Sequence, residues 1–362
     1  MKKVLHKGLV AFSLIFSGAL LISYSAAYIN PATISFPAFF GLAFPYLLVI
    51  NFLFVFYWLF RRKWSFLLPL VVILVGYGSI SDFFQLSTGE KTILASSEQL
   101  NILSYNVRSF DRYKWTNDPN TPRNIIKLIN SQEPDIVCLQ EYRSTSKGFL
   151  SLRSLKKELG MKYVHYSSEM SGVAIFSKYR IKKKASLSFG NEHLCKAIYA
   201  DLLIKNKILR VYNLHLESNR FVGKNYKFIK KDEYKGDEQD LNEIKDISFR
   251  LSSAFARRSE QALQIKDHIK QSPHVAVVCG DFNDTPNSYT YHQLSKNMKD
   301  AFVEQGKGIS TTYSGDFPSF RIDYLLYSDG LVCTEYDRIR KRYSDHYPIR
   351  GTFAFVSNII AE

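Results

Sequence analysis

Residues 275–283 read VAVVCGDFN, a run of apolar residues that ends abruptly in Gly280, Asp281 and Asn283. An apolar run of this length, rich in β-branched residues and closed by a turn signal, predicts a strand. A single carboxylate or amide at a strand end usually reflects ordinary turn chemistry. The motif therefore gains meaning only if the same pattern occurs elsewhere in the chain.

The pattern of a strand-like run followed at once by a carboxylate, an amide or an imidazole occurs six times. The other five cases are NILSYNV with Asn106, DIVCLQE with Gln140 and Glu141, RVYNLHLE with Asn213 and His215, FRIDYLL with Asp323, and SDHYP with Asp345 and His346. Each case alone is weak, but together they indicate a shared reactive site.

Strand-like runs alternate with helical patterns from Gln99 onward. The helical patterns are TPRNIIKLINSQ, SLRSLKKELG and SFRLSSAFARRSEQALQIKDHIK. This mixture predicts a layered α/β domain with sheets packed inside helices. The highly charged residues Ser218–Ile247 have no aligned apolar face, and we interpret them as an insertion or flexible loop. Residues 81–98 are polar and predict a linker.

The ordered motifs resemble those of the endonuclease/exonuclease/phosphatase superfamily, which includes DNase I-like nucleases, inositol-polyphosphate phosphatases and neutral sphingomyelinases. The matching motifs are SYNV, LQE, SGVAIFSK, NLHLE, GDFN, RIDYLL and SDHYP, and they cover about residues 99–356. SYNV or SGVAIFSK alone is modest support, whereas the ordered set of LQE, GDFN, RIDY and SDH is specific. The resemblance implies a four-layer α/β/β/α sandwich with two packed β-sheets, and a metal-dependent attack of water on a phosphate ester.

The resemblance also implies the site residues. Glu141 would be the principal metal ligand, with Asn106 and Asp345 nearby, and the metal would be Mg²⁺, with Mn²⁺ as the alternative. Such hard cations prefer oxygen ligands and can act as Lewis acids on phosphate oxygens. The implied catalytic residues are Asp281, which activates water, Asn283, which orients groups around the phosphate, His346 with its partner Asp323, and His215 at the phosphate or leaving group.

The first 80 residues are almost uncharged and contain three apolar stretches, Leu9–Tyr28, Phe36–Phe60 and Trp64–Ile80. A membrane helix needs about 20 predominantly apolar residues, so we predict three transmembrane helices, the third slightly short. Residues 1–80 would then be a membrane anchor and the bilayer a partner. The first stretch, preceded by Lys2, Lys3 and Lys7, also fits a signal peptide.

Basic residues near spans stay in the cytoplasm. Lys2, Lys3 and Lys7 precede the first span, and Arg61–Lys63 lies between the second and the third. With three spans, we predict a multi-pass protein of the cell membrane whose catalytic domain is extracytoplasmic. An even number of spans would place the catalytic domain in the cytoplasm.

The four cysteines are Cys138, Cys195, Cys279 and Cys333. Cys138 and Cys279 lie in apolar strand-like runs, so we expect small buried side chains there rather than a reactive site. Their spacing does not match a zinc site, although an extracytoplasmic location would permit disulfides.

The substrate class stays open between nucleic acid and a phospholipid headgroup. The chain carries a net charge of +15, which attracts any polyanion and does not distinguish the two. Membrane attachment favours the lipid slightly. The alternatives are a non-catalytic binding module on the same fold, and an N-terminal transport or sensing unit, which the lack of charge inside the spans disfavours. The sequence indicates no protein partner.

Overall fold

The computed structural model describes residues 2–86, 99–167, 172–189, 196–231, 234, 236–315 and 318–356. Cys195 and most of the predicted linker lie outside these residues. Cys138 and Cys279 are free and buried, as their apolar surroundings predicted, and Cys333 is free and buried as well.

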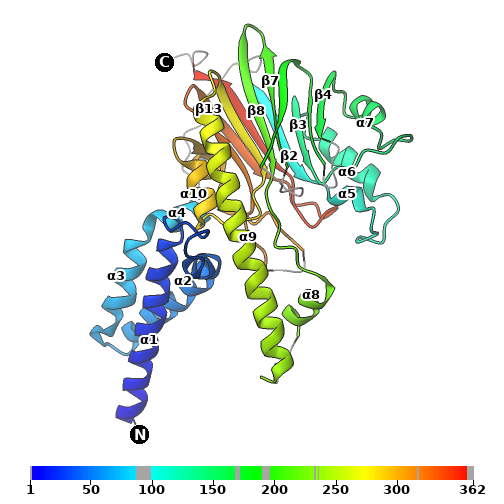
Figure 1. Ribbon diagram of the computed structural model, residues 1–362. Helices are drawn as coiled ribbons and strands as arrows, with labels where there is room; N and C mark the ends of the chain where they lie inside the picture. The colour runs from blue at the N-terminus through cyan, green and yellow to red at the C-terminus, as the bar shows by residue number, and fades with distance from the viewer. Residues whose placement is uncertain are drawn as a thin grey trace.

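Two six-stranded sheets lie face to face and form the centre of the soluble part (Figure 1). The first sheet has the order β13-β14-β2-β3-β5-β4, with bounds Leu331–Arg338, Ile349–Phe355, Leu100–Asn106, Ile136–Gln140, Val173–Ser177 and Tyr163–Ser167. The second has the order β10-β12-β9-β8-β7-β6, with bounds Lys299–Asp300, Asp323–Tyr327, Val275–Asp281, Lys207–His215, Lys196–Ile204 and Arg180–Leu187. Inward-facing side chains such as Ile102, Ile136, Val211 and Val277 are fully buried between the sheets.

Helices cover the outer face of each sheet. The first sheet is covered by α5 (Arg108–Asp111), α6 (Thr121–Asn130) and α7 (Leu152–Glu158), and the second by α9 (Glu238–Lys270) and α10 (Tyr289–Ser295). A further short helix, α11 (Ala301–Gln305), follows β10. Ile125, Ile126 and Ile129 form the apolar face of α6, as the sequence pattern predicted, and all three are buried. The predicted four-layer α/β/β/α sandwich is therefore confirmed.

Strand direction brings the predicted polar residues to one edge. β2 and β3 run parallel with Asn106 opposite Gln140, and β8 and β9 run parallel with His215 opposite Asp281. β12 pairs antiparallel with β9, so its first residue, Asp323, lies opposite Asp281. Because parallel strands end at the same edge of a sheet, side chains from distant motifs meet there.

The charged segment Ser218–Ile247 is not simply a loop, so that interpretation was wrong in part. It contains α8 (Gly223–Ile229) and the first turns of α9, which begins at Glu238. These turns lack an aligned apolar face and are stabilised by ion pairs instead. Lys224 lies 3.1 Å from Glu243, and Arg250 lies 3.0 Å from Asp246, four residues before it. Such pairs support an exposed helix.

The N-terminal region forms a bundle of apolar helices that extends away from the sandwich (Figure 1). Two helices, α1 (Lys2–Ser25) and α2 (Phe36–Phe60), are long and apolar enough to cross a membrane. The third apolar stretch is not one straight helix: it comprises η1 (Trp64–Phe66), α3 (Leu67–Val75) and α4 (Tyr77–Phe83), and the break bends it by 64°. By length and composition, the described residues therefore contain two candidate spans, or three if the bent pair counts as one.

Gly76 explains where the bend lies. An added Cβ at Gly76 would lie 2.1 Å from the ring of Tyr24, so only glycine permits this close approach. The Tyr24 hydroxyl donates a hydrogen bond to the carbonyl of Val72 at 3.0 Å. The third stretch is thus bent where α1 packs against it.

The bundle is joined directly to the sandwich. Residues Ser81–Leu86, which we predicted to lie in a linker, instead complete α4 and form β1 (Phe84–Leu86), which pairs antiparallel with β11 (Lys307–Ile309). Arg321 donates to the carbonyl of Asp82 at 2.8 Å and pairs with Asp300 at 2.6 Å. Arg321 therefore fastens the bundle to the sandwich.

Candidate active site

The predicted site residues converge on one cleft of about 270 Å³ at the edge where the strands end. Five of the eight residues line it: Glu141, Asp281, Asn283, Asp345 and His346. The other three, Asn106, His215 and Asp323, are buried and contact the lining residues. The two sheets meet here, because the side-chain amide of Asn106 in one sheet donates to Asp281 in the other at 3.0 Å.

Local backbone conformation turns two of these side chains at the strand ends. Glu141 directly follows β3 with φ of 53°, and Asn283 follows β9 with φ of 54°. A left-handed conformation is uncommon for residues other than glycine, although asparagine tolerates it. Such conformations concentrate at functional sites, where surrounding contacts hold them.

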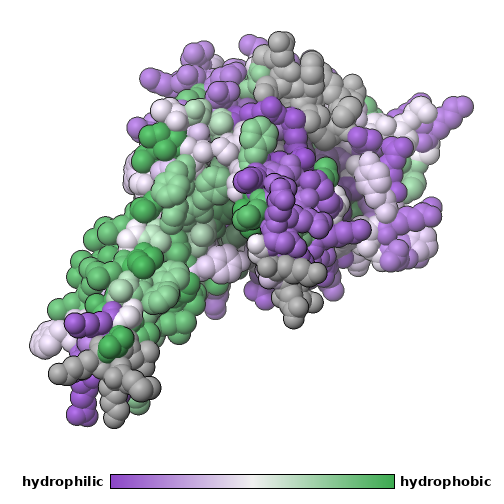
Figure 2. All heavy atoms as spheres, turned by 60° about the horizontal axis from the view of Figure 1, so that its bottom comes forward, coloured by the Kyte–Doolittle hydropathy of each residue, from purple (hydrophilic) through white to green (hydrophobic). Residues whose placement is uncertain are grey.

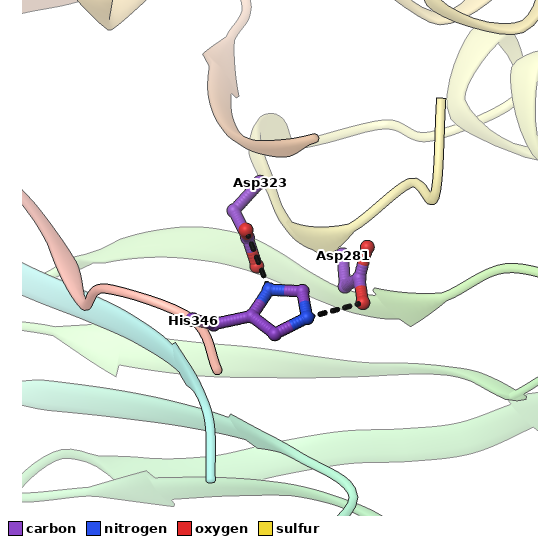
Figure 3. Close-up of side chains that lie close together, drawn as sticks. All are labelled: Asp281, Asp323 and His346. Atoms are coloured by element: carbon purple, nitrogen blue, oxygen red, sulfur yellow. Dashed lines mark hydrogen bonds and ion pairs between the residues drawn. The ribbon is translucent and has the colours of Figure 1, made fainter. Parts of the chain in front are cut away.

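His346 and Asp323 form a buried, hydrogen-bonded pair (Figure 3). The His346 Nδ1 atom donates to Asp323 Oδ2 at 2.9 Å, and its Nε2 atom lies 3.7 Å from Asp281 Oδ2. Burial by itself would lower the pKa of His346, but the carboxylates of Asp323 and Asp281 outweigh it and hold that pKa well above its ordinary value. His346 is therefore an imidazolium at neutral pH, with Nε2 directed toward Asp281.

Asp281 accepts hydrogen bonds through both carboxylate oxygens. Oδ2 accepts from Asn106, and Oδ1 accepts from the backbone N–H of Asn283 at 2.8 Å. Burial raises the pKa of Asp281 to about 6, even though the charge of His346 opposes this shift. A carboxylate whose pKa lies this close to neutral pH is suited to accept a proton during a reaction.

Glu141 and Asp345 bring two further carboxylates to the cleft. Glu141 is about one-third exposed, with a side-chain exposed fraction of 33%, and it accepts from the Asn106 amide at 3.3 Å. Asp345 lies 3.3 Å from Arg108 Nε. Burial, and then the like charge of Asp345, raise the pKa of Glu141. A cation bound between these carboxylates would relieve that repulsion.

The second histidine, His215, also approaches the Asp281 carboxylate. Its Nε2 atom is 3.7 Å from Glu141 Oε1 and 3.8 Å from Asp281 Oδ2. Its Nδ1 atom is buried and has no hydrogen-bond partner among the described residues. Burial lowers the pKa of His215, so this imidazole is neutral at neutral pH. The site thus holds one charged and one neutral imidazole.

Two groups of residues in the site could hold a cation. The donor atoms of Asp281, Asp323 and His346 lie within 4.8 Å of one another, but the short bond between His346 and Asp323 already uses two of them. Glu141 and Asp345 are more exposed to the cleft and are hard oxygen donors of the kind that Mg²⁺ prefers. Asn106 presents its Nδ2 to the carboxylates and its Oδ1 to the Arg108 N–H, so it would ligate only after turning its oxygen. The carboxylates Glu141 and Asp345 fit a divalent ion best.

Several residues of the cleft were missed by sequence reasoning. Arg108 lies two residues beyond Asn106, and its position just after a strand end was a usable signal. Arg258 is fully buried in α9, where it donates to Asp284 at 3.1 Å and to the Glu217 carbonyl at 2.8 Å. Tyr313 packs edge-on against the His346 ring at 5.3 Å. No local pattern distinguishes these last two from ordinary helix and loop residues.

Two polar residues singled out in the sequence lie between the sheets instead of in the cleft. Asn213 is fully buried and donates to the carbonyls of Leu139 and Ala174 at 2.9 and 2.8 Å. Gln140 donates to Asn213 at 2.6 Å. These amides link the two sheets behind the site, a structural role.

Comparisons with known proteins agree with this fold. A model of the endonuclease/exonuclease/phosphatase family matches residues 103–346, and a model of a domain of unknown function matches residues 5–83. A search of curated proteins returned no match.

Three solved structures show the same fold at low sequence identity. D. rerio TDP2 complexed with single strand DNA product is 17% identical with a TM-score of 0.51, covering 70% of this chain and 98% of that one. The human Nocturnin catalytic domain with bound sulfate anion is 18% identical with a TM-score of 0.51, covering 73% and 96%. An endonuclease/exonuclease/phosphatase from Bacteroides vulgatus is 18% identical with a TM-score of 0.52, covering 71% and 99%. Together with the family model, which spans most of the sandwich, these findings show that the chain belongs to the endonuclease/exonuclease/phosphatase family.

Proposed function

We propose that this chain is a membrane-anchored phosphoesterase that depends on a divalent metal and cleaves phosphate esters by attack of water. The observation that carries the proposal is the position of the His346 imidazole, which bonds to the buried carboxylate of Asp323 at 2.9 Å and faces a second carboxylate, Asp281, across 3.7 Å. Two similar folds support a phosphate substrate: the Nocturnin structure contains sulfate and the D. rerio TDP2 structure contains single-stranded DNA.

The protein's own residues would carry the proton transfers. Asp281 would orient the attacking water and accept its proton as the new bond between water oxygen and phosphorus forms. The His346 imidazolium would donate a hydrogen bond from Nε2 to a phosphate oxygen and stabilise the negative charge that develops there. Neutral His215 would donate a hydrogen bond to the leaving-group oxygen, which departs with the electron pair of its broken bond to phosphorus and takes up a proton from water. Asn283 holds Asp281 in place through its backbone N–H.

Glu141 and Asp345 would hold the metal ion, with Asn106 as a further ligand. A bound Mg²⁺ or Mn²⁺ would supply Lewis-acid polarisation of the phosphate oxygens. Both carboxylates line the cleft, and Asp345 forms an ion pair with Arg108. Two features support this metal site: both side chains offer carboxylate oxygens, which Mg²⁺ prefers as ligands, and the two like charges repel each other.

We also propose that residues 1–80 anchor the chain in the cell membrane and that residues 99–356 form the catalytic domain. In the structure, Arg61–Lys63 follows α2 at the end opposite the residues that contact the sandwich, and the N-terminus lies at that same far end (Figure 1). Basic residues at the far end support a cytoplasmic location for it and an extracytoplasmic location for the catalytic domain. Accessibility of the catalytic domain to protease in intact cells tests this orientation, and protection until the inner membrane is breached would reverse it.

The enzymatic proposal is tested with the full-length protein in detergent and bis-p-nitrophenyl phosphate as substrate. We expect hydrolysis with Mg²⁺ or Mn²⁺ that EDTA abolishes, and a loss of roughly 10²-fold or more in Glu141→Ala, Asp281→Asn and His346→Ala. Asp337→Asn is the matched control, because Asp337 is an exposed carboxylate on β13 with a side-chain exposed fraction of 54%.

Two outcomes would contradict the proposal. An unchanged rate in Asp281→Asn would remove the residue assigned to the water. Metal binding by calorimetry without turnover of diesters, monoesters, DNA, RNA or phospholipids would instead identify a non-catalytic binding module.

A further inference from the structure

Leu42 of the apolar helix α2 forms part of one wall of the active-site cleft. Two neighbours on the same helix face also contact the sandwich. The Phe39 ring lies 5.4 Å from that of Phe255 in α9, and the Tyr46 ring lies 6.5 Å from that of Phe320. Positions 39, 42 and 46 are separated by three and four residues, so they share one face of the helix.

This wall is held closely against the sandwich. An added Cβ at Gly41 would lie 2.6 Å from the carbonyl oxygen of Asn287, so the helix backbone packs directly on that loop. The Asn287 side chain donates to the carbonyl of Ser23 in α1 at 2.9 Å. The Ser259 hydroxyl in α9 donates to Asn30, between α1 and α2, at 2.8 Å. The position of Leu42 in the cleft therefore follows from several independent contacts.

The cleft is lined by the reactive side chains Glu141, Asp281 and His346 and also by apolar side chains, including Leu42 and Phe320. We call these apolar side chains together the apolar part of the cleft. The apolar surface of the bundle runs up to the sandwich, where it meets hydrophilic surface (Figure 2). An apolar wall beside the reactive residues favours a substrate that carries hydrocarbon next to its phosphate, because contact between them removes apolar surface from water.

If α2 crosses the bilayer as proposed, the position of Leu42 along α2 lies near the membrane boundary. Leu42 lies six residues after Phe36, the first residue of α2, or about 9 Å along the helix axis at the usual rise per residue. That distance corresponds to the outer part of a helix about 37 Å long, near the level of lipid headgroups and the first methylenes of their chains. The cleft volume of about 270 Å³ suits a headgroup with a short part of a chain, and the rest of the chain would remain in the bilayer.

We propose that the substrate is a membrane lipid whose phosphate ester enters the cleft sideways from the bilayer, with its hydrocarbon chain along Leu42 and the adjacent face of α2. This inference rests on the proposed phosphoesterase function and names its substrate class. The phosphate group lies against Glu141, Asp281 and His346 while the chain contacts the apolar wall. The bilayer thus supplies the substrate, and α2 is part of the binding site as well as an anchor.

The test compares two synthetic diesters, methyl p-nitrophenyl phosphate and dodecyl p-nitrophenyl phosphate, with the full-length protein in lipid nanodiscs. They share the scissile bond and leaving group and differ only in the hydrocarbon chain. We expect kcat/KM to be at least tenfold higher for the dodecyl ester, and Leu42→Trp, which fills the apolar part, to reduce this ratio at least tenfold. Val49→Trp is the control, because Val49 lies seven residues further along the same helix face and is 57% exposed.

The outcomes separate this inference from the general function. Equal rates for the two esters, or an equal loss of the ratio in both tryptophan variants, would overturn the lipid inference and leave the phosphoesterase intact. No hydrolysis of either ester would overturn the phosphoesterase itself. If Leu42→Trp does not fold, Leu42→Ala replaces it, and an unchanged chain-length ratio in that variant counts against the apolar wall. If the enzyme cleaves a single-stranded oligonucleotide faster than the dodecyl ester, and substitution of Leu42 does not change that rate, the substrate is nucleic acid and the lipid inference is overturned.

Discussion

Replacing Asp323 with Asn should shift the pH dependence of the reaction toward acid. The substitution keeps the shape of the side chain but removes the negative charge that lies 2.9 Å from His346 Nδ1. In the folded protein that charge helps hold the pKa of His346 well above its ordinary value, against the opposing effect of burial. Without the Asp323 charge, the effect of burial is opposed less strongly, so the pKa of His346 falls and the imidazolium loses its proton at a lower pH.

The size of the shift follows from the energy of the hydrogen bond. A hydrogen bond to a charged group contributes about 1.5–3 kcal/mol, and one pKa unit corresponds to about 1.4 kcal/mol. The pKa of His346 should therefore fall by about one to two units. The alkaline limb of the pH–rate profile should move to lower pH by the same amount.

Stability should change with pH in a defined direction. Because the pKa of His346 is raised by folding, the pair stabilises the fold fully below the unfolded histidine pKa of about 6.5. This contribution is lost as pH rises through the folded pKa. Asp323→Asn should therefore lower the free energy of unfolding more at pH 6 than at high pH, above the folded pKa.

The assay combines the pH–rate profile of bis-p-nitrophenyl phosphate hydrolysis with thermal unfolding in detergent at both pH values. Asp337→Asn, an exposed carboxylate-to-amide change, serves as the control and should alter neither. An alkaline limb that overlays the wild type, with destabilisation independent of pH, would refute the role assigned to the His346–Asp323 pair.

Three further predictions concern a carboxylate, a helix contact and a buried ion pair. Since burial raises the pKa of Asp281 to about 6, kcat/KM should fall as pH drops through about 6 and this carboxylate takes up a proton; an acid limb below pH 4.5 contradicts that role. Gly41→Ala should lower the unfolding midpoint by the equivalent of about 1–3 kcal/mol, because the added methyl group overpacks the contact. Gly18→Ala should leave the midpoint unchanged, because no atom lies within 4 Å of its added Cβ. Equal midpoints in the two variants would show that α2 is loosely held. Arg321→Met leaves the buried Asp300 without its cation and should cost about 3–5 kcal/mol of unfolding free energy, most of which the second change Asp300→Asn should restore in denaturant titrations.

Much of the sandwich was predictable because its signals are local. The run VAVVCGDFN forms β9 with Asp281 as its last residue, since alternation and burial of β-branched residues act within a few positions. The isoleucines of α6 share a face for the same reason. Local rules failed where stability comes from elsewhere: the first turns of α9 are held by ion pairs such as Arg250 with Asp246, and the third apolar stretch bends at Gly76 because Tyr24 packs there.

The sequence by itself determined the strand ends, the residue types placed at them and the family, because these depend on short-range patterns and motif order. Only the tertiary structure decided which side chains meet. Asn106 bonds to Asp281 across 175 positions, and Leu42 reaches the same cleft as His346. Such contacts depend on how two sheets and a helix bundle pack against one another. These elements approach only when their apolar faces are buried together, and the periodicity of a sequence does not specify the distance between them.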